Sequence, residues 1–281
     1  MKAMTTHLAA LKDVAEQVAL EAATAIRNKR AELGDIAGYT QTKSTPVDPV
    51  TVVDTYAEEV IAQRLRQLRP DDGLVGEEGS DTAGTSGVTW IVDPIDGTVN
   101  FVYGIPQFAV SIAAAMDGEV IAGAVINVST GELFSAAKGQ GAMVQRDGGT
   151  EQLACNSVTD PAKALLATGF GYSAARRAQQ AQFVAKLLPQ VRDIRRMGSA
   201  ALDLCAVASG QVDAHLEHGL NAWDYAAGAL IAAEAGAEVH VPPLSSSGAL
   251  GELVFVAAPG IFDQLWEIVA QAGGTEPFRV H

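Results

Sequence analysis

Two aspartates lie three residues apart at the end of an apolar stretch, in the segment Asp93-Pro94-Ile95-Asp96. Pro94 has a fixed φ and no N–H, so a turn here can project both carboxylates to one side and leave the Ile95 carbonyl free. Three oxygen donors then face one small volume, which suits a hard divalent cation. The alternative is a surface turn with two solvated aspartates.

Gly97 and Thr98 follow these aspartates directly. Gly97 has no Cβ to obstruct a ligand, and its amide and that of Thr98 can bind an anion if a helical turn starts there. Carboxylates beside such a turn repel a phosphate group unless cations lie between them. The segment therefore indicates a phosphate site that needs Mg2+.

Two further acidic positions are weaker signals. Glu77 and Glu78 follow a short apolar stretch, a pattern that is common in loops. Asp224 follows Asn221 at the start of an alanine-rich stretch, where a first-turn acid stabilises a helix by about 0.3–1 kcal/mol. Considered alone, Asp224 is best interpreted as a helix-capping residue.

The elements that must position these residues follow from apolar periodicity and from turn signals. A helix is expected to start after a cap at Thr5 or Thr6 and to run through Ala22, and a loop from Lys43 to Pro49 precedes a helix at 52–68 with Asp54 in its first turn. Strands are expected at 74–77, 89–93, 108–116, 119–128, 132–137, near 165, near 191 and at 253–257, and helices at 173–188, 199–209, 222–235 and from 261. Asp117-Gly118 and Thr130-Gly131 are hairpin signals, so the middle of the chain is expected to be antiparallel.

Composition limits the class of protein. The chain has 281 residues, 48% of them hydrophobic, and a formal net charge of −14, which is typical of a compact globular protein and argues against stable nucleic-acid binding. Cys155 and Cys205 are far apart and indicate neither a disulfide framework nor a thiol metal site. Asp13 and Glu16 interrupt any signal peptide, and no apolar run reaches membrane-spanning length, so we expect a cytoplasmic protein without membrane contact.

In their order and spacing, these motifs resemble those of the inositol monophosphatase family, and within it most closely the actinobacterial branch. The resemblance extends from about residue 9 to residue 270. Its segments are 76–78, 90–101, 196–201, 217–219 and 223–228. It implies an α/β fold, a layered αβαβα sandwich of the sugar-phosphatase type. Residues 1–150 would hold a helix pair and an antiparallel sheet with most metal ligands, and 151–281 a smaller α/β half with a soft boundary between them.

The resemblance also implies a metal site of two or three Mg2+ ions. Glu77, Asp93 and the carbonyl of Ile95 would hold the first ion. Asp93, Asp96 and Asp224 would hold the second, and a third, weaker ion would lie near Glu77. Because Asp224 belongs to the second half, metal binding is expected to need both halves docked.

The same resemblance assigns further roles in catalysis. Asp54 and Thr98 would position and deprotonate the attacking water, with Glu77 as a third catalytic residue. The amides of Gly97 and Thr98 would receive the phosphate, and Lys43 would belong to a mobile loop.

The substrate rim would include Ser199, Ala200 and Glu217 together with Asp96 and Asp224. Glu217 would bond a substrate hydroxyl, although an acid at the end of a strand is an almost equal interpretation. His215 and His218 flank Glu217 and are interpreted as ordinary histidines, which a strand would place on opposite faces.

The implied activity is that of a phosphomonoesterase that hydrolyses inositol 1-phosphate to myo-inositol and phosphate, is inhibited by lithium and forms a homodimer. The metal motif is equally compatible with histidinol phosphate, fructose 1,6-bisphosphate or 3′-phosphoadenosine 5′-phosphate. Acidic acceptors favour a polyol, whereas Arg195 and Arg196 leave a second anionic group open. An interaction protein of transcription complexes is the hypothesis from another class, because some relatives have that role.

Overall fold

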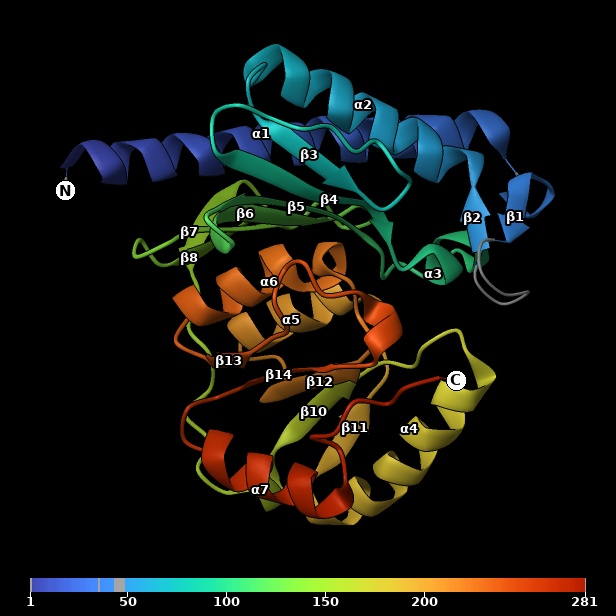
Figure 1. Cartoon of the computed structure of the whole chain (residues 1–281), viewed down its shortest axis with the longest axis vertical. Coiled ribbons are helices and arrows are strands. Elements are labelled where there is room, and N and C mark those ends of the chain that lie inside the picture. The colour runs from blue at the N-terminus through green and yellow to red at the C-terminus, as the bar shows by residue number, and fades with distance from the viewer. Residues whose placement is uncertain (1, 35, 43–48, 281) are drawn as a thin grey trace.

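The computed structural model of the chain describes residues 2–34, 36–42 and 49–280. Figure 1 shows five layers that alternate between helices and sheets, and α1 and α2 form the first layer. A seven-stranded sheet, then α5 and α6, then a five-stranded sheet, and finally α4 and α7 follow. The helices are α1 Lys2–Leu33, α2 Val52–Leu68, α3 Thr98–Tyr103, α4 Ala174–Leu187, α5 Ala200–Ala208, α6 Ala222–Glu234 and α7 Phe262–Ala272. The expected αβαβα order is confirmed.

The first sheet has the strand order β3-β4-β5-β6-β7-β8-β9. β3 and β4 are parallel, and every other neighbouring pair is antiparallel, which confirms the hairpins expected between residues 108 and 137. The strands are β3 Gly73–Gly76, β4 Val88–Asp96, β5 Ala109–Met116, β6 Glu119–Asn127, β7 Leu133–Ala137, β8 Ala142–Arg146 and β9 Gly149–Gln152. A separate pair, β1 Thr40–Thr42 and β2 Pro49–Thr51, precedes α2.

The second sheet has the order β11-β10-β12-β14-β13. β10 is parallel to both β11 and β12, whereas β14 is antiparallel to both β12 and β13. Its strands are β10 Leu165–Thr168, β11 Asp193–Arg195, β12 Ala214–His218, β13 Glu238–His240 and β14 Leu253–Ala257. The mixed sheet therefore places Glu217 at the end of a central strand.

Three apolar clusters hold the layers together, and β4 contributes to two of them. Trp90 and Val92 pack with residues of α1 and α2 such as Ile26. Ile91, on the opposite face of the strand, packs with residues of α5 and α6 such as Leu204. Alternate side chains of a strand point to opposite faces, so β4 is anchored from both sides. The third cluster lies between the second sheet and the outer helices α4 and α7.

Several predicted boundaries were wrong. α1 begins at Lys2, so neither Thr5 nor Thr6 is its N-cap. β4 continues to Asp96 instead of ending at Asp93, because a register shift lets pairing with β5 resume after Pro94. Strands β1, β2, β8, β9, β12 and β13 were not among the expected strands; each has at most five residues and a weak pattern. None of the described helices, even the 32-residue α1, combines the length and the apolar character that crossing a membrane requires.

Candidate metal centre and active site

Three carboxylates converge where the first sheet meets the middle helices. Asp93 and Asp96 come from the end of β4, and Asp224 comes from the first turn of α6. Each offers a carboxylate oxygen within 4.8 Å of the other two. Hard cations prefer such oxygen donors, so the donor set fits Mg2+.

The end of β4 is shaped by an irregularity in its pairing with β5. Asp93 is paired with Ser111 and Asp96 with Ala109, so three residue steps on β4 oppose two on β5. An extra residue in one strand re-aims the side chains on either side of it. Asp93 Oδ1 accepts a hydrogen bond from the Ile95 amide at 2.9 Å, which fixes the carboxylate against the turn.

Asp96 joins the first sheet to the middle helices. Its Oδ2 accepts hydrogen bonds from the Ser199 hydroxyl at 2.6 Å and from the Ala201 amide at 2.7 Å. Ser199 is the N-cap of α5, so the carboxylate lies at the N-terminus of that helix. Oδ2 is therefore occupied by protein donors, and the Ala200 amide also bonds this carboxylate.

Asp224 is held by its own helix, as the sequence predicted for a first-turn acid. Its Oδ2 accepts a hydrogen bond from the Asn221 amide at 2.7 Å, within a capping box that starts α6. The Ser111 hydroxyl of β5 donates to the Trp223 carbonyl at 3.1 Å, which ties this helix start to the first sheet. The capping role and the metal-site position are therefore compatible.

Glu77 lies beside this trio, at the end of β3. Repulsion by its carboxyl and a hydrogen bond between the two carboxyls both contribute to raising the pKa of Asp93. Its amide donates to the Val92 carbonyl at 3.3 Å, so β3 and β4 deliver the two acids side by side. The predicted proximity of Glu77 and Asp93 is thus present in the structure.

Glu58 of α2 is a residue that the sequence reasoning missed. Its two carboxylate oxygens accept hydrogen bonds from the amides of Glu78 at 2.7 Å and Ser80 at 2.8 Å, and only 1% of its surface is exposed. These bonds hold the loop that carries Glu77. The available signal was helical spacing, because Glu58 follows Asp54 by four residues and shares its helix face.

Asp54 and Thr98 form the pair that the resemblance implied. The Thr98 hydroxyl lies 3.1 Å from Asp54 Oδ1 and 3.1 Å from the Ile95 carbonyl oxygen. Asp54 Oδ2 accepts hydrogen bonds from the amide of Thr51 at 2.9 Å and from its hydroxyl at 2.5 Å, in a capping box that starts α2. Asp54 is fully buried, so its orientation is fixed from both sides.

A helical turn starts at Thr98, as the anion-site interpretation requires. Gly97 is the residue before α3 and has a φ of 95°, a conformation that favours glycine. A Cβ at this position would lie 3.0 Å from the carbonyl oxygens of Gln107 and Gly198. Any residue with a side chain would therefore disturb the turn at this position.

The trio carries charge that the protein does not neutralise. Burial, followed by repulsion from Glu77, Asp96 and Asp224, raises the pKa of Asp93 well above its usual range. Burial also raises the pKa of Asp224 well above its usual range and that of Asp96 to about 6. Carboxyls this close resist ionising together without a counterion, and a divalent cation supplies one.

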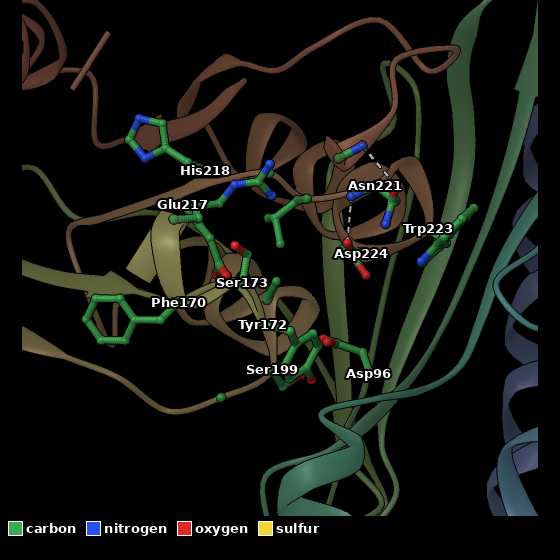
Figure 2. Close-up of a pocket in the computed structure, with 18 of the residues that line it drawn as sticks. Asp96, Phe170, Tyr172, Ser173, Ser199, Glu217, His218, Asn221, Trp223 and Asp224 are labelled. Carbon is green, nitrogen blue, oxygen red and sulfur yellow. Dashed lines mark hydrogen bonds between the residues drawn. The ribbon is translucent and has the colours of Figure 1, made fainter. Parts of the chain in front are cut away.

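A pocket of about 530 Å³ opens beside the carboxylates (Figure 2). The predicted site residues that line it are Glu77, Asp96, Gly97, Ser199, Ala200, Glu217 and Asp224. Asp54, Asp93, Ile95 and Thr98 are buried and do not line it. Lys43 lies outside the described residues.

Charges of both signs lie at the pocket wall formed by the second half of the chain. Burial raises the pKa of Glu217 to about 8. The positive charge of Arg196, which also lines the pocket, acts in the opposite direction and lowers it. Arg195 instead pairs with the exposed Asp193 at 2.6 Å. Of the two arginines that left a second anionic group open, only Arg196 faces the pocket.

The fold and the site together define a layered α/β phosphatase. The model of the "Inositol monophosphatase family" matches residues 7–266, so the chain belongs to the inositol monophosphatase family. The chain is 52% identical over 278 residues to an "Inositol-1-monophosphatase" of Mycobacterium leprae, covering 95% of this chain and 96% of that protein. This agrees with the actinobacterial branch that the motifs indicated.

Two further relatives extend the comparison. The solved structure "Mycobacterium tuberculosis SuhB" superposes with a TM-score of 0.82 at 48% identity, covering 95% of this chain and 98% of that one. A "Nus factor SuhB" of Escherichia coli is 42% identical over 191 residues, covering 67% of this chain and 70% of that protein.

Proposed function

We propose that the chain is an Mg2+-dependent phosphomonoesterase that hydrolyses inositol 1-phosphate to myo-inositol and phosphate. The observation that carries this proposal is the convergence of Asp93, Asp96 and Asp224 beside the helical turn at Gly97. Acids and an anion-binding turn are compatible only with cations between them. The names of the mycobacterial relatives support inositol 1-phosphate as the substrate.

In this proposal the donor set takes two or three ions. Glu77, Asp93 and the Ile95 carbonyl hold the first, and Asp93, Asp96 and Asp224 hold the second, with a third, weaker ion near Glu77. The Ile95 carbonyl oxygen has two lone pairs, so its contact with the Thr98 hydroxyl leaves one free. Bound Mg2+ lowers the pKa of water, neutralises phosphoryl oxygens and stabilises the leaving alkoxide.

The residues of the chain then perform the remaining steps. The Thr98 hydroxyl positions the attacking water. Asp54, which lies 3.1 Å from that hydroxyl, accepts the proton that the water loses. The amides of Gly97 and Thr98 donate to the phosphate oxygens. No protein nucleophile takes part, because water attacks phosphorus directly.

The substrate side of the pocket is proposed to recognise a polyol. Glu217 and Asp96, which both line the pocket, accept hydrogen bonds from hydroxyl groups. Ser199 and Ala200 limit the space beside them, and Asp224 faces the same volume. Acceptors at this wall favour hydroxyl-bearing esters over those with a second phosphate.

The deciding experiment measures phosphate release from four esters with Mg2+ or with EDTA. The esters are inositol 1-phosphate, histidinol phosphate, fructose 1,6-bisphosphate and 3′-phosphoadenosine 5′-phosphate. We expect Mg2+-dependent turnover with the highest kcat/KM for inositol 1-phosphate. Preference for another ester would replace the substrate and keep the chemistry, and turnover that persists in EDTA would overturn the metal mechanism.

Further properties are proposed from the family resemblance. We expect a cytoplasmic homodimer in which residues 1–150 and 151–281 form two halves of one compact unit. We also expect LiCl, compared with KCl at equal ionic strength, to inhibit phosphate release. Analytical ultracentrifugation of the purified chain tests the dimer.

A role in transcription complexes is the second candidate, and the relatives named "Nus factor SuhB" favour it. Such a role does not need turnover. Capture of transcription proteins by both the wild type and an Asp93→Asn variant would support it, and a chain that captures none would remove it.

A further inference from the structure

Three titratable side chains cluster against the pocket, and the proposed chemistry uses only one of them. Asp203 belongs to α5, and His215 and Glu217 lie on the same face of β12. His215 Nδ1 is 3.8 Å from Asp203 Oδ2, and its Nε2 is 4.0 Å from Glu217 Oε2. His215 therefore lies between the two acids. His218 points to the opposite face, where it stacks on Phe278.

The cluster is buried and incomplete. His215 is fully buried and Asp203 is 1% exposed. Both nitrogens of His215 and Oδ1 of Asp203 lack a hydrogen-bond partner among the described residues. Leaving such buried groups unpaired is unfavourable, and a shift of roughly 1 Å brings both contacts to hydrogen-bonding distance.

Closing both contacts restricts where the protons lie. A neutral imidazole has one N–H donor and one acceptor nitrogen. Asp203 can donate to Nδ1 while Nε2–H donates to Glu217, or Nδ1–H can donate to Asp203 while Glu217 donates to Nε2. In both arrangements Glu217 Oε2 is engaged by His215, and Oε1 remains an acceptor.

The burial of the cluster favours a neutral imidazole and protonated carboxyl groups, as these hydrogen bonds require. Burial lowers the pKa of His215 to about 3, so the imidazole is neutral. Burial raises the pKa of Asp203 well above its usual range and that of Glu217 to about 8, so the two acids have protons to share. A protonated Glu217 favours the second arrangement, in which its Oε2 donates to Nε2 and its Oε1 accepts. Asp96 and Arg196 are the other charged groups that act on both acids, and their effects are opposite in sign.

We propose that Asp203 and His215 are positioning residues that hold Glu217 so that its Oε1 accepts a hydroxyl group of a polyol phosphate. The inference rests on the proposed function and deepens it, because it names what makes Glu217 selective. A substrate hydroxyl is a donor and matches this oxygen. A phosphate or carboxylate group at the same place offers only acceptors and is rejected.

The test compares His215→Phe, which removes both nitrogens at similar volume, with His215→Gln, which keeps one donor and one acceptor. Initial rates are measured with Mg2+ for inositol 1-phosphate and for 4-nitrophenyl phosphate, which has no hydroxyl for Glu217. We expect His215→Phe to raise KM for inositol 1-phosphate by about tenfold with kcat within about twofold, as for the loss of roughly 1.4 kcal/mol. His215→Gln should restore most of KM, and both variants should hydrolyse 4-nitrophenyl phosphate like the wild type.

Equal losses on both substrates would show a merely structural role, and an unchanged KM in His215→Phe would show that His215 does not act on Glu217. Thermal unfolding of each variant identifies a folding defect, and in that case the isosteric Asp203→Asn replaces His215→Phe in the same comparison. A double variant with Glu217→Gln should raise KM no further than Glu217→Gln alone, whereas additive effects would overturn the coupling.

The failure of the proposed function is visible in the wild type alone. If the wild type prefers another hydroxyl-bearing ester, the variants are compared on that ester, and an unchanged KM in His215→Phe overturns the positioning role. If the wild type hydrolyses no ester, both proposals fail together.

Discussion

The two ends of the pocket are built differently. At the metal end, backbone amides hold all three acids: Ile95 holds Asp93 at 2.9 Å, Ala201 holds Asp96 at 2.7 Å, and Asn221 holds Asp224 at 2.7 Å. At the other end, which contains Glu217 and which we call the hydroxyl end, His215 lies 3.8 Å from Asp203 and 4.0 Å from Glu217. It has no hydrogen bond to either acid.

In the proposed function, this difference separates the residues that perform the chemistry from those that select the substrate. A site whose acids are held by secondary structure keeps its geometry before any cation binds, which suits catalysis that depends on positioning. A site whose acids depend on neighbouring side chains can change its preference through a single substitution. The metal end is therefore the rigid region, and the hydroxyl end is the adjustable one.

The strongest test of the rigid end is Asp93→Asn. It removes a charge that two ions are proposed to share, so we expect kcat to fall by about 10³-fold or more. Because the change also relieves repulsion from Glu77, Asp96 and Asp224, the metal-free melting temperature should not fall. Asp13→Asn, an exposed change on α1, is the control, and near-normal activity of Asp93→Asn would refute the site assignment.

Thr98→Ala tests whether the buried Asp54–Thr98 pair acts on the reaction or on binding. We expect kcat to fall by about 100-fold with KM within about twofold, since positioned proton transfer contributes roughly 10²–10⁴-fold. Steady-state kinetics on inositol 1-phosphate measures both. A change confined to KM would make Thr98 a binding residue.

Glu58→Gln asks whether the rigidity of the metal end extends to the loop that carries Glu77. The amide group of Gln cannot accept both backbone N–H groups, and losing one hydrogen bond to a charged group costs about 1.5–3 kcal/mol. We expect the Mg2+ concentration for half-maximal rate to rise by about tenfold, with kcat at saturating Mg2+ largely kept. Glu59→Gln, exposed on the same helix, is the matched control. Equal Mg2+ dependence of the two variants would contradict the role of Glu58.

The smallest expected effect is a pH dependence of the stabilisation by Mg2+. The raised pKa values of Asp93, Asp96 and Asp224 mean that the folded state binds protons more tightly than the unfolded state. Without metal, the stability that these three groups contribute is therefore full below the ordinary aspartate pKa of 3.8 and is lost as the pH rises through about 6, the pKa of Asp96. Mg2+ should raise the melting temperature by a few degrees more at about pH 8 than at about pH 5.5, since 1 kcal/mol shifts it by roughly 2–4 °C. If calorimetry shows that Mg2+ raises the melting temperature equally at both pH values, Asp93, Asp96 and Asp224 carry no uncompensated charge.

Much of the fold was predictable because its signals are local. Apolar periodicity placed α2, α4, α5 and α6 to within about a residue, and Asp117-Gly118 marked the β5–β6 hairpin. Short strands such as β8 and β9 were missed, because a four- or five-residue strand has too few alternations to be distinguished from a loop.

The candidate site was predictable only in part, because only some of its residues are neighbours in the sequence. Asp93, Asp96 and Gly97 are adjacent in the chain, so their type and spacing alone indicated metal and phosphate chemistry. Asp224 alone was indistinguishable from a helix cap, and only the family resemblance placed it at the metal site. Glu58 carried no signal beyond helical spacing from Asp54, because its partners are the backbone amides of Glu78 and Ser80.

By itself, the sequence determined the local elements and the donor types that they carry, because backbone preferences and capping act between near neighbours. The tertiary structure alone decided which of those donors meet. Ser199 reaches Asp96 across 103 positions and Thr98 reaches Asp54 across 44, and both contacts depend on how the layers pack. The place of His215 between Asp203 and Glu217 was decided in the same way, by the packing of α5 against β12.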